Sequence, residues 1–506
     1  MEQCSSNVSN AATIILGIPY CNITNMTIKS LPVAADRSVE IGWWTLRLAG
    51  PVIAAAAVRL ALLTFLLARI GSGALMHADT SSYLIPGRNL LLHGSFMADG
   101  APDLLRTPGY PLFLAIAMIP GAPTAALANV ILSVFSLILV WRLGRIVFDE
   151  PGVALGAAWI FAFEAGSVSL SVVLLSETLF LVFLLLSLER LAVFLRTLRL
   201  PALAAAGLWL AAATFVRPIS YYLPFALALG LFLVLMRVPG LRWKAPAVLL
   251  ISVLPWLAAW QIRNRIETGF GGFTSISDVN LYYLSAASVT AHLDHRPTAE
   301  VVSEFGFIDF TNNSGQVYLQ QSYLAQHPEQ AGWNQGQRLS YLHSTAVHII
   351  LAHPGAYLRL CIPELLKTVF FPSVYGLSNP KVARTPTYSA VIADQGLAAW
   401  RLILARAQAH PWVMAENTFF WLLLQGLYLF AARGFLRGRA HPACQWLLLG
   451  ASLYFLAVLV ASPMASSRFR MPVMPVVCIF AAAGFLRAKA AATSIPNNPR
   501  AGPRPC

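Results

Sequence analysis

The sequence predicts an all-α polytopic membrane protein, and three observations carry that prediction. The chain of 506 residues is 57% hydrophobic and only 11% charged, with a mean hydropathy of +0.65. Soluble domains average about 25% charged residues, so the composition excludes an ordinary soluble protein. Apolar runs of about 20 residues, the length of a helix that crosses a bilayer, recur along the chain. Arginine and lysine collect in alternate connections between these runs, as is typical of loops that stay in the cytoplasm.

About ten membrane spans are expected along the chain. The run at 112–147 is too long for one span and is interrupted by Pro120-Gly121-Ala122-Pro123. We therefore expect a short interfacial helix there, followed by a span near 125–147. The expected spans are 48–71, 112–147, 152–174, 177–196, 201–216, 219–237, 245–262, 416–436, 443–462 and 470–487.

Basic residues predict which ends of these spans face the cytoplasm. The short connections at 142–145, 190–199, 237–244 and 433–439 are rich in arginine and lysine, which places them inside together with both chain ends. The expected organisation is a cytoplasmic segment 1–47, a transmembrane core 48–262 with an outer loop 72–111, a long outer loop 263–415 with interfacial helices, C-terminal spans 416–487 and a cytoplasmic tail 488–506.

Charge and cysteine content narrow the functional classes. A net charge of +14 is compatible with nucleic-acid binding, but in a membrane protein it reflects cytoplasmic loops and contacts with anionic membrane lipid. We therefore expect no nucleic-acid partner. The six cysteines show no CxxC spacing, so neither a disulfide framework nor a metal cluster is indicated. No nucleotide-binding glycine motif occurs either, and no cofactor is evident.

Two acidic residues stand at predicted outer ends of spans, where a charge is costly unless it serves a site. Asp79 follows the first span, and Tyr83 lies four residues further on, so the two share a helix face. Glu177 opens the fourth span. The alternatives are a helix N-cap for Asp79 and a favourable contact with the helix dipole for Glu177. As functional residues, the two carboxylates would line one cavity.

Arginines also occur at predicted outer ends, against the positive-inside rule. Guanidinium groups match phosphate oxygens, so a cationic pocket for an anionic ligand would explain them. The alternative is a set of ordinary exceptions, with Arg106 as a snorkelling interfacial charge. The candidate ligand-binding residues are Tyr83, Arg88, Arg106, Tyr110, Arg217, Arg263, Asn264, Asn280, Arg468 and Arg470.

Taken in order, these motifs resemble the GT-C fold of membrane glycosyltransferases. The resemblance is to the bacterial branch similar to protein O-mannosyltransferases and lipid A aminoarabinose transferase, and it covers about residues 48–487. The matching elements are Asp79-x-x-x-Tyr83, Gly94-Ser-Phe96, Arg106-Thr-Pro-Gly-Tyr-Pro111, Leu175-Ser-Glu177, Arg217-Pro218, Trp260-x-x-Arg263-Asn264 and Arg468-Phe-Arg470-Met-Pro472.

The resemblance implies a hexosyl- or pentosyltransferase of the inner membrane with its site on the periplasmic face. It implies a polyprenyl-phosphate-linked sugar as donor and a glycan, lipid or protein hydroxyl as acceptor. Asp79 matches the acidic residue that acts as base in that family, and Arg217 and Arg470 fall where the family places basic residues near the lipid phosphate. Glu177 is the second candidate catalytic carboxylate. Thr80 follows Asp79 where the mannosyltransferases have an Asp-Glu pair, which leaves sugar, acceptor and metal requirement open. A divalent cation near Asp79 is compatible with the sequence, although no ligand spacing indicates one.

Two other functions remain as alternatives. A transporter or flippase of a lipid-linked glycan is expected to show inverted repeats and buried polar groups in mid-membrane, whereas here polar groups collect at the outer rim. An O-antigen polymerase or ligase depends on Arg and His in later loops, not on an acid just after the first span. Whether Asp79 or the long-loop arginines are essential separates the enzyme classes.

Overall fold

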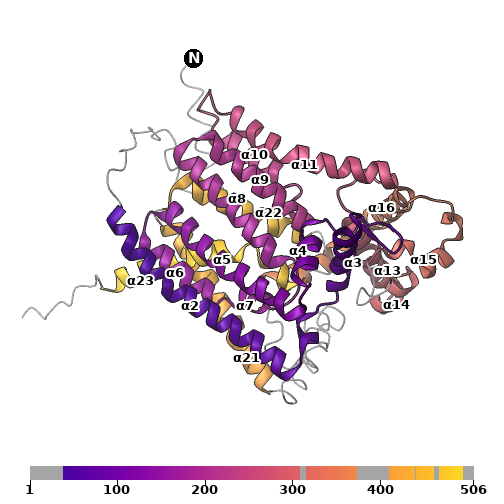
Figure 1. The fold of residues 1–506 in the computed structure, drawn as a ribbon, viewed down its shortest axis with the longest axis horizontal. Coiled ribbons are helices and arrows are strands. Elements are labelled where there is room, and N and C mark those ends of the chain that lie inside the picture. The colour runs from indigo at the N-terminus through magenta and orange to yellow at the C-terminus, as the bar shows by residue number, and fades with distance from the viewer. Residues whose placement is uncertain are drawn as a thin grey trace, which may run out of the picture. The chain divides into compact units, whose positions relative to one another are not determined.

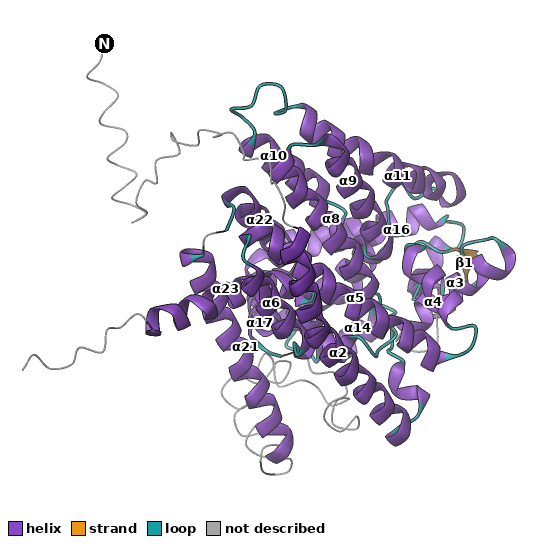
Figure 2. Ribbon diagram, turned by 60° about the vertical axis from the view of Figure 1, so that its left-hand side comes forward, coloured by secondary structure: helices purple, strands orange, loops and turns teal. Residues whose placement is uncertain are grey.

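The structure is a computed structural model that describes residues 38–307, 315–372, 408, 411–438, 440–460 and 466–493. Residues 47–506 form one compact unit. The described residues are almost entirely helical, and their sheet is a single antiparallel hairpin of β1 (Met97–Ala98) and β2 (Ala101–Pro102). Long helices lie side by side, and α3 (Thr80–His93) packs with β1 beside them (Figures 1 and 2). The all-α prediction is confirmed.

Every predicted span overlaps an apolar helix, but the count of ten spans is not confirmed. Five helices of the described residues are long and apolar enough to cross a membrane, or six if the bent pair of α16 (Gln335–Ala352) and α17 (Pro354–Phe370) is one span. The long helices are α2 (Ser38–Arg69), α5 (Ala122–Phe148), α8 (Glu177–Thr197), α11 (Lys244–Thr268) and α21 (Pro411–Arg437). The shorter apolar helices are α6 (Pro151–Ala162), α9 (Leu200–Val216), α10 (Leu223–Val234) after η3 (Pro218–Ser220), α22 (Pro442–Val460) and α23 (Met474–Thr493).

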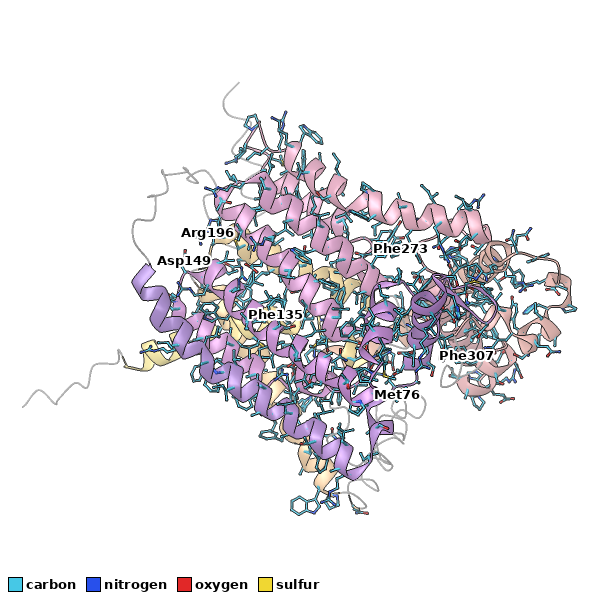
Figure 3. The ribbon with its side chains drawn as sticks, in the orientation of Figure 1. Met76, Phe135, Asp149, Arg196, Phe273 and Phe307 are labelled. Carbon is cyan, nitrogen blue, oxygen red and sulfur yellow. The ribbon has the colours of Figure 1, made fainter. Side chains whose placement is uncertain are left out.

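The most buried long helix is α8, which packs against α5 and α9. Its two ends carry different charges. Glu177 is its first residue, and Arg196 in its last turn pairs with Asp149 at 2.8 Å. Figure 3 shows Asp149 and Arg196 together at one end of the helices and Met76 near the other. The arginine-rich connections and the loop that carries Asp79 therefore lie at opposite ends of the helices.

The predicted span 152–174 is not one helix, and this is a correction. It is broken after α6, and the separate helix α7 (Ala165–Leu170) begins after a gap of two residues. The Glu164 side chain accepts hydrogen bonds from the backbone of Gly166 and Ser167, so it caps α7 rather than joining the site. On the other side of the break, Arg59 of α2 donates to the terminal carbonyl of Ala162 at 2.9 Å. A buried arginine and a capping glutamate thus satisfy backbone groups that a broken helix leaves open.

Arg59 is expected to hold this break together. It is fully buried, donates to Ser133, Ser167 and two carbonyls, and is attracted by the charge of Glu164. Arg59→Met should lower the free energy of unfolding by about 3 kcal/mol, because several buried acceptors lose a charged donor. Thermal unfolding in detergent measures this. Arg69→Met, on an exposed arginine of the same helix, serves as the control. Equal unfolding temperatures for both variants would contradict the role.

The long predicted loop 263–415 begins as an extension of α11 and continues as short helices. These are α12 (Ile276–Asn280), η4 (Leu281–Ala286), α13 (Ala287–Leu293), α14 (Thr298–Glu304), η6 (Val317–Leu319), α15 (Gln321–Gln326), η7 (Pro328–Gln330), α16 (Gln335–Ala352) and α17 (Pro354–Phe370). The axes of α16 and α17 differ by 97° at a break before Pro354, while Pro363 lies inside α17 instead of breaking it. Residues 373–407 of this loop, 1–37 of the predicted N-terminal segment and 494–506 of the predicted tail lie outside the described residues.

A second hydrophobic core fixes the first loop against the long one. Leu104 and Leu105, just after β2, are buried among Tyr283, Tyr318 and Leu339. The break predicted in 112–147 is present, since α4 (Gly109–Ala117) ends before Gly121 and α5 follows. Residues 94–108 are therefore held between the membrane helices and the long loop, and they deliver Arg106 to the site.

Candidate active site

Asp79 lies in the short connection before α3, and its side chain does not cap that helix. The helix begins at Thr80, but the Asp79 carboxylate accepts no hydrogen bond from its first turn. Instead, Oδ2 lies 2.7 Å from Arg468 Nη2 and Oδ1 lies 3.3 Å from Arg106 Nη2. The helix-cap interpretation is therefore wrong, and Asp79 is clamped between two guanidinium groups that come from opposite ends of the sequence.

Arg106 is oriented by α3 along its whole guanidinium group. Its Nε donates to Ser82 Oγ at 2.9 Å and its Nη1 donates to Tyr83 Oη at 3.1 Å. The group also stacks over the Tyr83 ring, 4.2 Å from the centroid, and Tyr110 packs edge-on against the same ring. Because Asp79, Ser82 and Tyr83 lie on one face of the start of α3, a single arginine contacts all three. The Arg106 guanidinium group is therefore held by specific contacts and does not simply extend to the membrane surface as a snorkelling charge.

Glu177 forms the second half of the site. Its Oε1 lies 2.6 Å from Arg217 Nη1 and 3.7 Å from Arg468 Nε, and its side chain is only 3% exposed. Arg217 also donates to Ser176 Oγ at 3.2 Å, and Tyr83 Oη lies 3.3 Å from the same hydroxyl. Arg468 thus bridges both acids, and the hydroxyl of Ser176 connects the two halves.

We name Asp79, Arg106, Glu177, Arg217 and Arg468 the charged cluster. Three arginines face two carboxylates, so the cluster carries a net charge of +1 when all are ionised. Burial alone would raise the pKa of Asp79, but Arg468 and Arg106 outweigh it and hold the pKa well below its usual value. Asp79 is therefore ionised at neutral pH, and the surplus charge of the cluster suits an anion.

His77 is a neutral neighbour of the cluster. Its Nδ1 accepts the backbone N–H of Asp79 at 3.1 Å and lies 3.5 Å from Asp79 Oδ2. Burial lowers the pKa of His77, and Arg468 lowers it further. The imidazole thus adds no charge at neutral pH.

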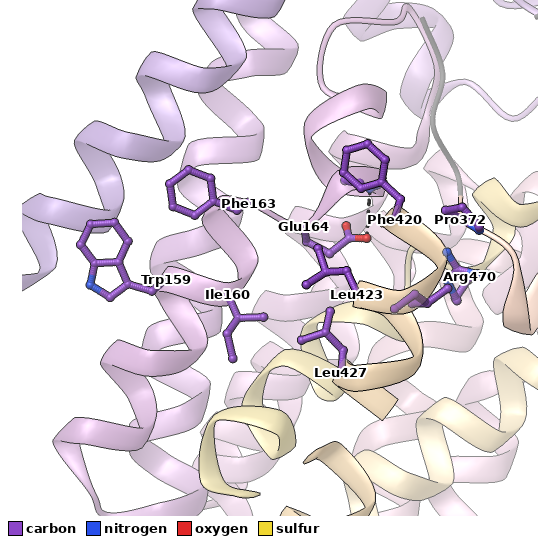
Figure 4. Close-up of a pocket in the computed structure, with 12 residues that line it drawn as sticks. Trp159, Ile160, Phe163, Glu164, Pro372, Phe420, Leu423, Leu427 and Arg470 are labelled. Atoms are coloured by element: carbon purple, nitrogen blue, oxygen red, sulfur yellow. Dashed lines mark hydrogen bonds between the residues drawn. The ribbon is translucent and has the colours of Figure 1, made fainter. Parts of the chain in front are cut away.

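Two hollows lie near η9 (Ser467–Arg470). A small one is lined by Glu177, Arg217 and Arg468 of the cluster, with Phe469 under both arginines. A larger pocket of about 320 Å³ between α6, α7 and α21 is mostly apolar, with Glu164 and Arg470 as its charged residues (Figure 4). None of the five cluster residues lines the larger pocket, so the charged cluster and the apolar pocket are separate sites.

Several predicted ligand-binding residues lie outside the cluster. Arg470 points away from it, and its Nη1 donates to the carbonyls of Thr368, Val369 and Phe371 at the end of α17. Arg263 donates to the carbonyls of Phe96 and Asp103, and Asn264 donates to those of Gly272 and Phe273. Arg88 is exposed on α3, and Asn280 is half-buried in α12. In this structure Arg470, Arg263 and Asn264 bind backbone carbonyls.

Sequence reasoning missed the hydroxyls and the histidine that complete the site. Ser82, Ser176 and His77 each contact a cluster residue. All three flank a predicted acid, but serine and histidine are common at helix starts, so the pattern alone does not single them out.

The residues present do not form a metal site as they stand. Both Asp79 oxygens face guanidinium groups, which repel a cation. Among the described residues, no three His, Cys, Asp or Glu side chains are grouped to hold a metal ion. A divalent cation would need Arg106 and Arg468 to withdraw from Asp79 first.

Comparisons with known proteins give a likeness of fold. No family model matches the sequence, and no curated protein matches it. The chain is similar to archaeal oligosaccharyltransferase AglB from Archaeoglobus fulgidus, with an inhibitory peptide and a dolichol-phosphate, at 11% identity and a TM-score of 0.47. That alignment covers 91% of this chain and 53% of AglB, so the chain spans about half the length of AglB.

The chain is also similar to ArnT from Cupriavidus metallidurans. The apo form aligns at 14% identity over 90% of this chain and 80% of ArnT, with a TM-score of 0.33. The form bound to undecaprenyl phosphate aligns at 12% identity, over 88% and 79% of the two chains, with a TM-score of 0.33.

Proposed function

We propose that the protein is a membrane glycosyltransferase that moves a sugar from a polyprenyl-phosphate-linked donor to a hydroxyl acceptor. One observation carries the proposal: an ionised, half-buried Asp79 lies between two arginines of a cationic cluster at the end of apolar helices. Arginines suit the phosphate, the helices suit the lipid chain, and the acid suits the acceptor hydroxyl. The ordered sequence motifs support the same class.

In the proposed reaction Asp79 is the general base. The acceptor hydroxyl gives its proton to an Asp79 oxygen while its own oxygen forms a bond to the anomeric carbon. The bond between that carbon and the phosphate oxygen breaks, and the polyprenyl phosphate leaves with the electron pair. Arginines of the cluster stabilise the charge that develops on the phosphate. A single displacement of this kind inverts the anomeric centre.

The arginines that clamp Asp79 also make it a weak base, and donor binding would relieve this. Arg106 and Arg468 hold its pKa low. A donor phosphate that takes over these guanidinium groups would leave the carboxylate with fewer positive neighbours and raise its basicity. The same two arginines would thus bind the donor and activate the base in one step.

Glu177 acts in this proposal as the second acid of the site. Its side chain contacts both Arg217 and Arg468, and Arg468 in turn contacts Asp79. Without it, two arginines would face each other without a counter-charge between them. We therefore assign Glu177 to arranging the phosphate site rather than to moving the proton.

The proposed location is the inner membrane, with the cluster on the periplasmic face. The arginine-rich ends of the same helices lie opposite the cluster and would face the cytoplasm by the positive-inside rule. The acceptor would be a glycan, a lipid or a protein of the cell envelope.

Deletion of the chromosomal copy tests the function in cells. A transferase should leave one envelope glycan, lipid or protein without a single sugar, and the wild-type chain should restore it. A shortened polymer instead would favour the polymerase alternative, and loss of an entire glycan would favour the flippase. An unchanged envelope by mass spectrometry would contradict the proposal.

Tyr83→Phe should reduce transfer moderately. The hydroxyl receives a hydrogen bond from Arg106 and lies beside Ser176, while the ring carries the stacked guanidinium. Removing only the hydroxyl should lower kcat/KM by about tenfold, the lower end of the effect of one hydrogen bond to a charged group. Initial rates at varied donor concentration measure this. An effect as large as that of Tyr83→Ala would show that the hydroxyl carries the whole role.

A further inference from the structure

Asp103 is a buried acid outside the charged cluster that contacts Arg106 through the backbone. It lies just after β2, and its side chain is fully buried. Its Oδ1 accepts the backbone N–H of Arg106 at 2.9 Å. Among the described residues, Oδ2 has no hydrogen-bond partner. Asp103 therefore closes the turn from which the Arg106 side chain extends to Asp79.

The segment 103–105 is anchored by later parts of the chain. Arg263 Nη1 donates to the Asp103 carbonyl at 3.3 Å, and the Ser275 N–H donates to the Leu104 carbonyl at 2.7 Å. Thr274 Oγ1 donates to the Leu105 carbonyl at 2.7 Å. With its main chain fixed from α11 and from the start of the long loop, the turn has little room to move. Because the backbone of this turn is fixed, the protonation state of the Asp103 carboxyl is what can still change around Arg106.

Among the described residues, no lysine, arginine or histidine forms an ion pair with the Asp103 carboxyl, although charged groups lie near it. Arg106 and Asp99 lie on its own loop, Arg263 faces it from α11, and Tyr318 faces it from η6. Burial is the main reason that the pKa of Asp103 is raised to about 7. The charge of Asp99 acts in the same direction, whereas the backbone N–H groups of Arg106 and Leu105 and the charge of Arg106 oppose it. A buried carboxylate oxygen without a donor is costly, whereas a neutral carboxyl keeps the hydrogen bond to Arg106 without that cost.

We propose that Asp103 is a proton-linked positioning residue, which holds Arg106 at Asp79 when neutral and competes for its guanidinium charge when ionised. The inference rests on the proposed function. With Asp103 neutral, the cluster offers a net charge of +1 to an anionic donor; ionised Asp103 beside Arg106 cancels that surplus. Donor binding should therefore weaken as Asp103 loses its proton.

Binding of a farnesyl methyl phosphodiester to the full chain in detergent tests this between pH 5.5 and 8.5. The probe carries one charge throughout this range, so it does not titrate itself. Wild-type affinity should fall about fivefold from pH 6 to pH 8, the size of one nearby charge. Asp103→Asn keeps the acceptor oxygen and should bind equally at both pH values. Asp294→Asn, which alters an exposed acid of the long loop, should follow the wild type.

Asp103→Ala separates positioning from charge. It removes the acceptor for the Arg106 N–H and should weaken binding at every pH, whereas the asparagine variant should retain the low-pH affinity of the wild type. Wild-type pH dependence in Asp103→Asn would overturn the proposal, and so would equal affinities of the alanine and asparagine variants.

Stability without any ligand tests Asp103 independently of the proposed function. An acid whose folded pKa is raised binds more protons when folded between its two pKa values, so stability falls as pH rises through that interval. From pH 5 to pH 8 the Tm of the wild type should fall relative to Asp103→Asn. Parallel curves would overturn the Asp103 proposal. A wild-type protein that binds no phosphodiester at any pH would contradict the proposed function. The comparison of Tm between the wild type and Asp103→Asn would still test the Asp103 proposal in that case.

Discussion

Asp79→Asn is expected to abolish sugar transfer while leaving the protein folded. The amide keeps the shape of the carboxylate but cannot take the proton of an acceptor hydroxyl. General-base catalysis contributes about 100- to 10,000-fold, so kcat should fall by at least about 100-fold. The KM for the donor should change less, since Arg106, Arg217 and Arg468 remain. Initial rates and thermal unfolding of the purified protein measure both quantities.

The control for this variant is Asp99→Asn, which removes an exposed acid from the same outer loop. It should transfer at the wild-type rate. Asp79→Glu, which keeps the charge but moves it by one methylene, should retain a small part of the activity. Near-normal transfer by a well-folded Asp79→Asn protein would exclude Asp79 as the base.

Arg468→Ala should have the second largest effect, because Arg468 contacts both acids. It lies 2.7 Å from Asp79 and 3.7 Å from Glu177. Its loss removes a proposed partner of the donor phosphate and leaves two mostly buried carboxylates that share less positive charge. We expect kcat/KM for the donor to fall about 100-fold or more, with a lower Tm. The dependence of rate on donor concentration separates a loss of binding from a loss of chemistry.

Arg468→Lys and Arg69→Ala are matched controls. Lysine keeps the charge but offers no fork that reaches two carboxylates, so it should recover only part of the activity. Arg69 is an exposed arginine at the end of α2, and its removal should leave transfer unchanged. Full activity of Arg468→Lys would show that charge alone matters, and full activity of Arg468→Ala would contradict the phosphate site.

The helical positions were predictable from hydropathy, whereas the break within 152–174 was not. Apolar runs and the Pro120-Gly121 interruption mark local properties of the chain. The break at Glu164 depends on Arg59, which reaches it from a helix about a hundred residues earlier. An arginine such as Arg59 inside an apolar run indicates buried polar contacts, but the sequence of the run does not show which residues the arginine contacts.

The cluster was predictable in part because topology brings the ends of different spans together. Asp79, Glu177, Arg106, Arg217 and Arg468 all lie at predicted outer ends, and all five meet. Arg470 shares that position with Arg468, yet it turns to the carbonyls of α17. Two residues of separation in a single helical turn point side chains in different directions, and the sequence does not tell which direction faces the acids. Asp103 carries no motif at all, since its importance arises from burial.

Release of polyprenyl phosphate is the decisive measurement of sugar transfer from a lipid-linked donor. Purified protein in lipid vesicles is supplied with single polyprenyl-phosphate-linked sugars and with an acceptor extract from the deletion strain, and the free lipid phosphate is quantified by mass spectrometry. The wild type should release it with one of the sugars and transfer that sugar to the extract, while Asp79→Asn should not. A sugar that crosses the bilayer still bound to its lipid, or equal release by both proteins, would contradict the account.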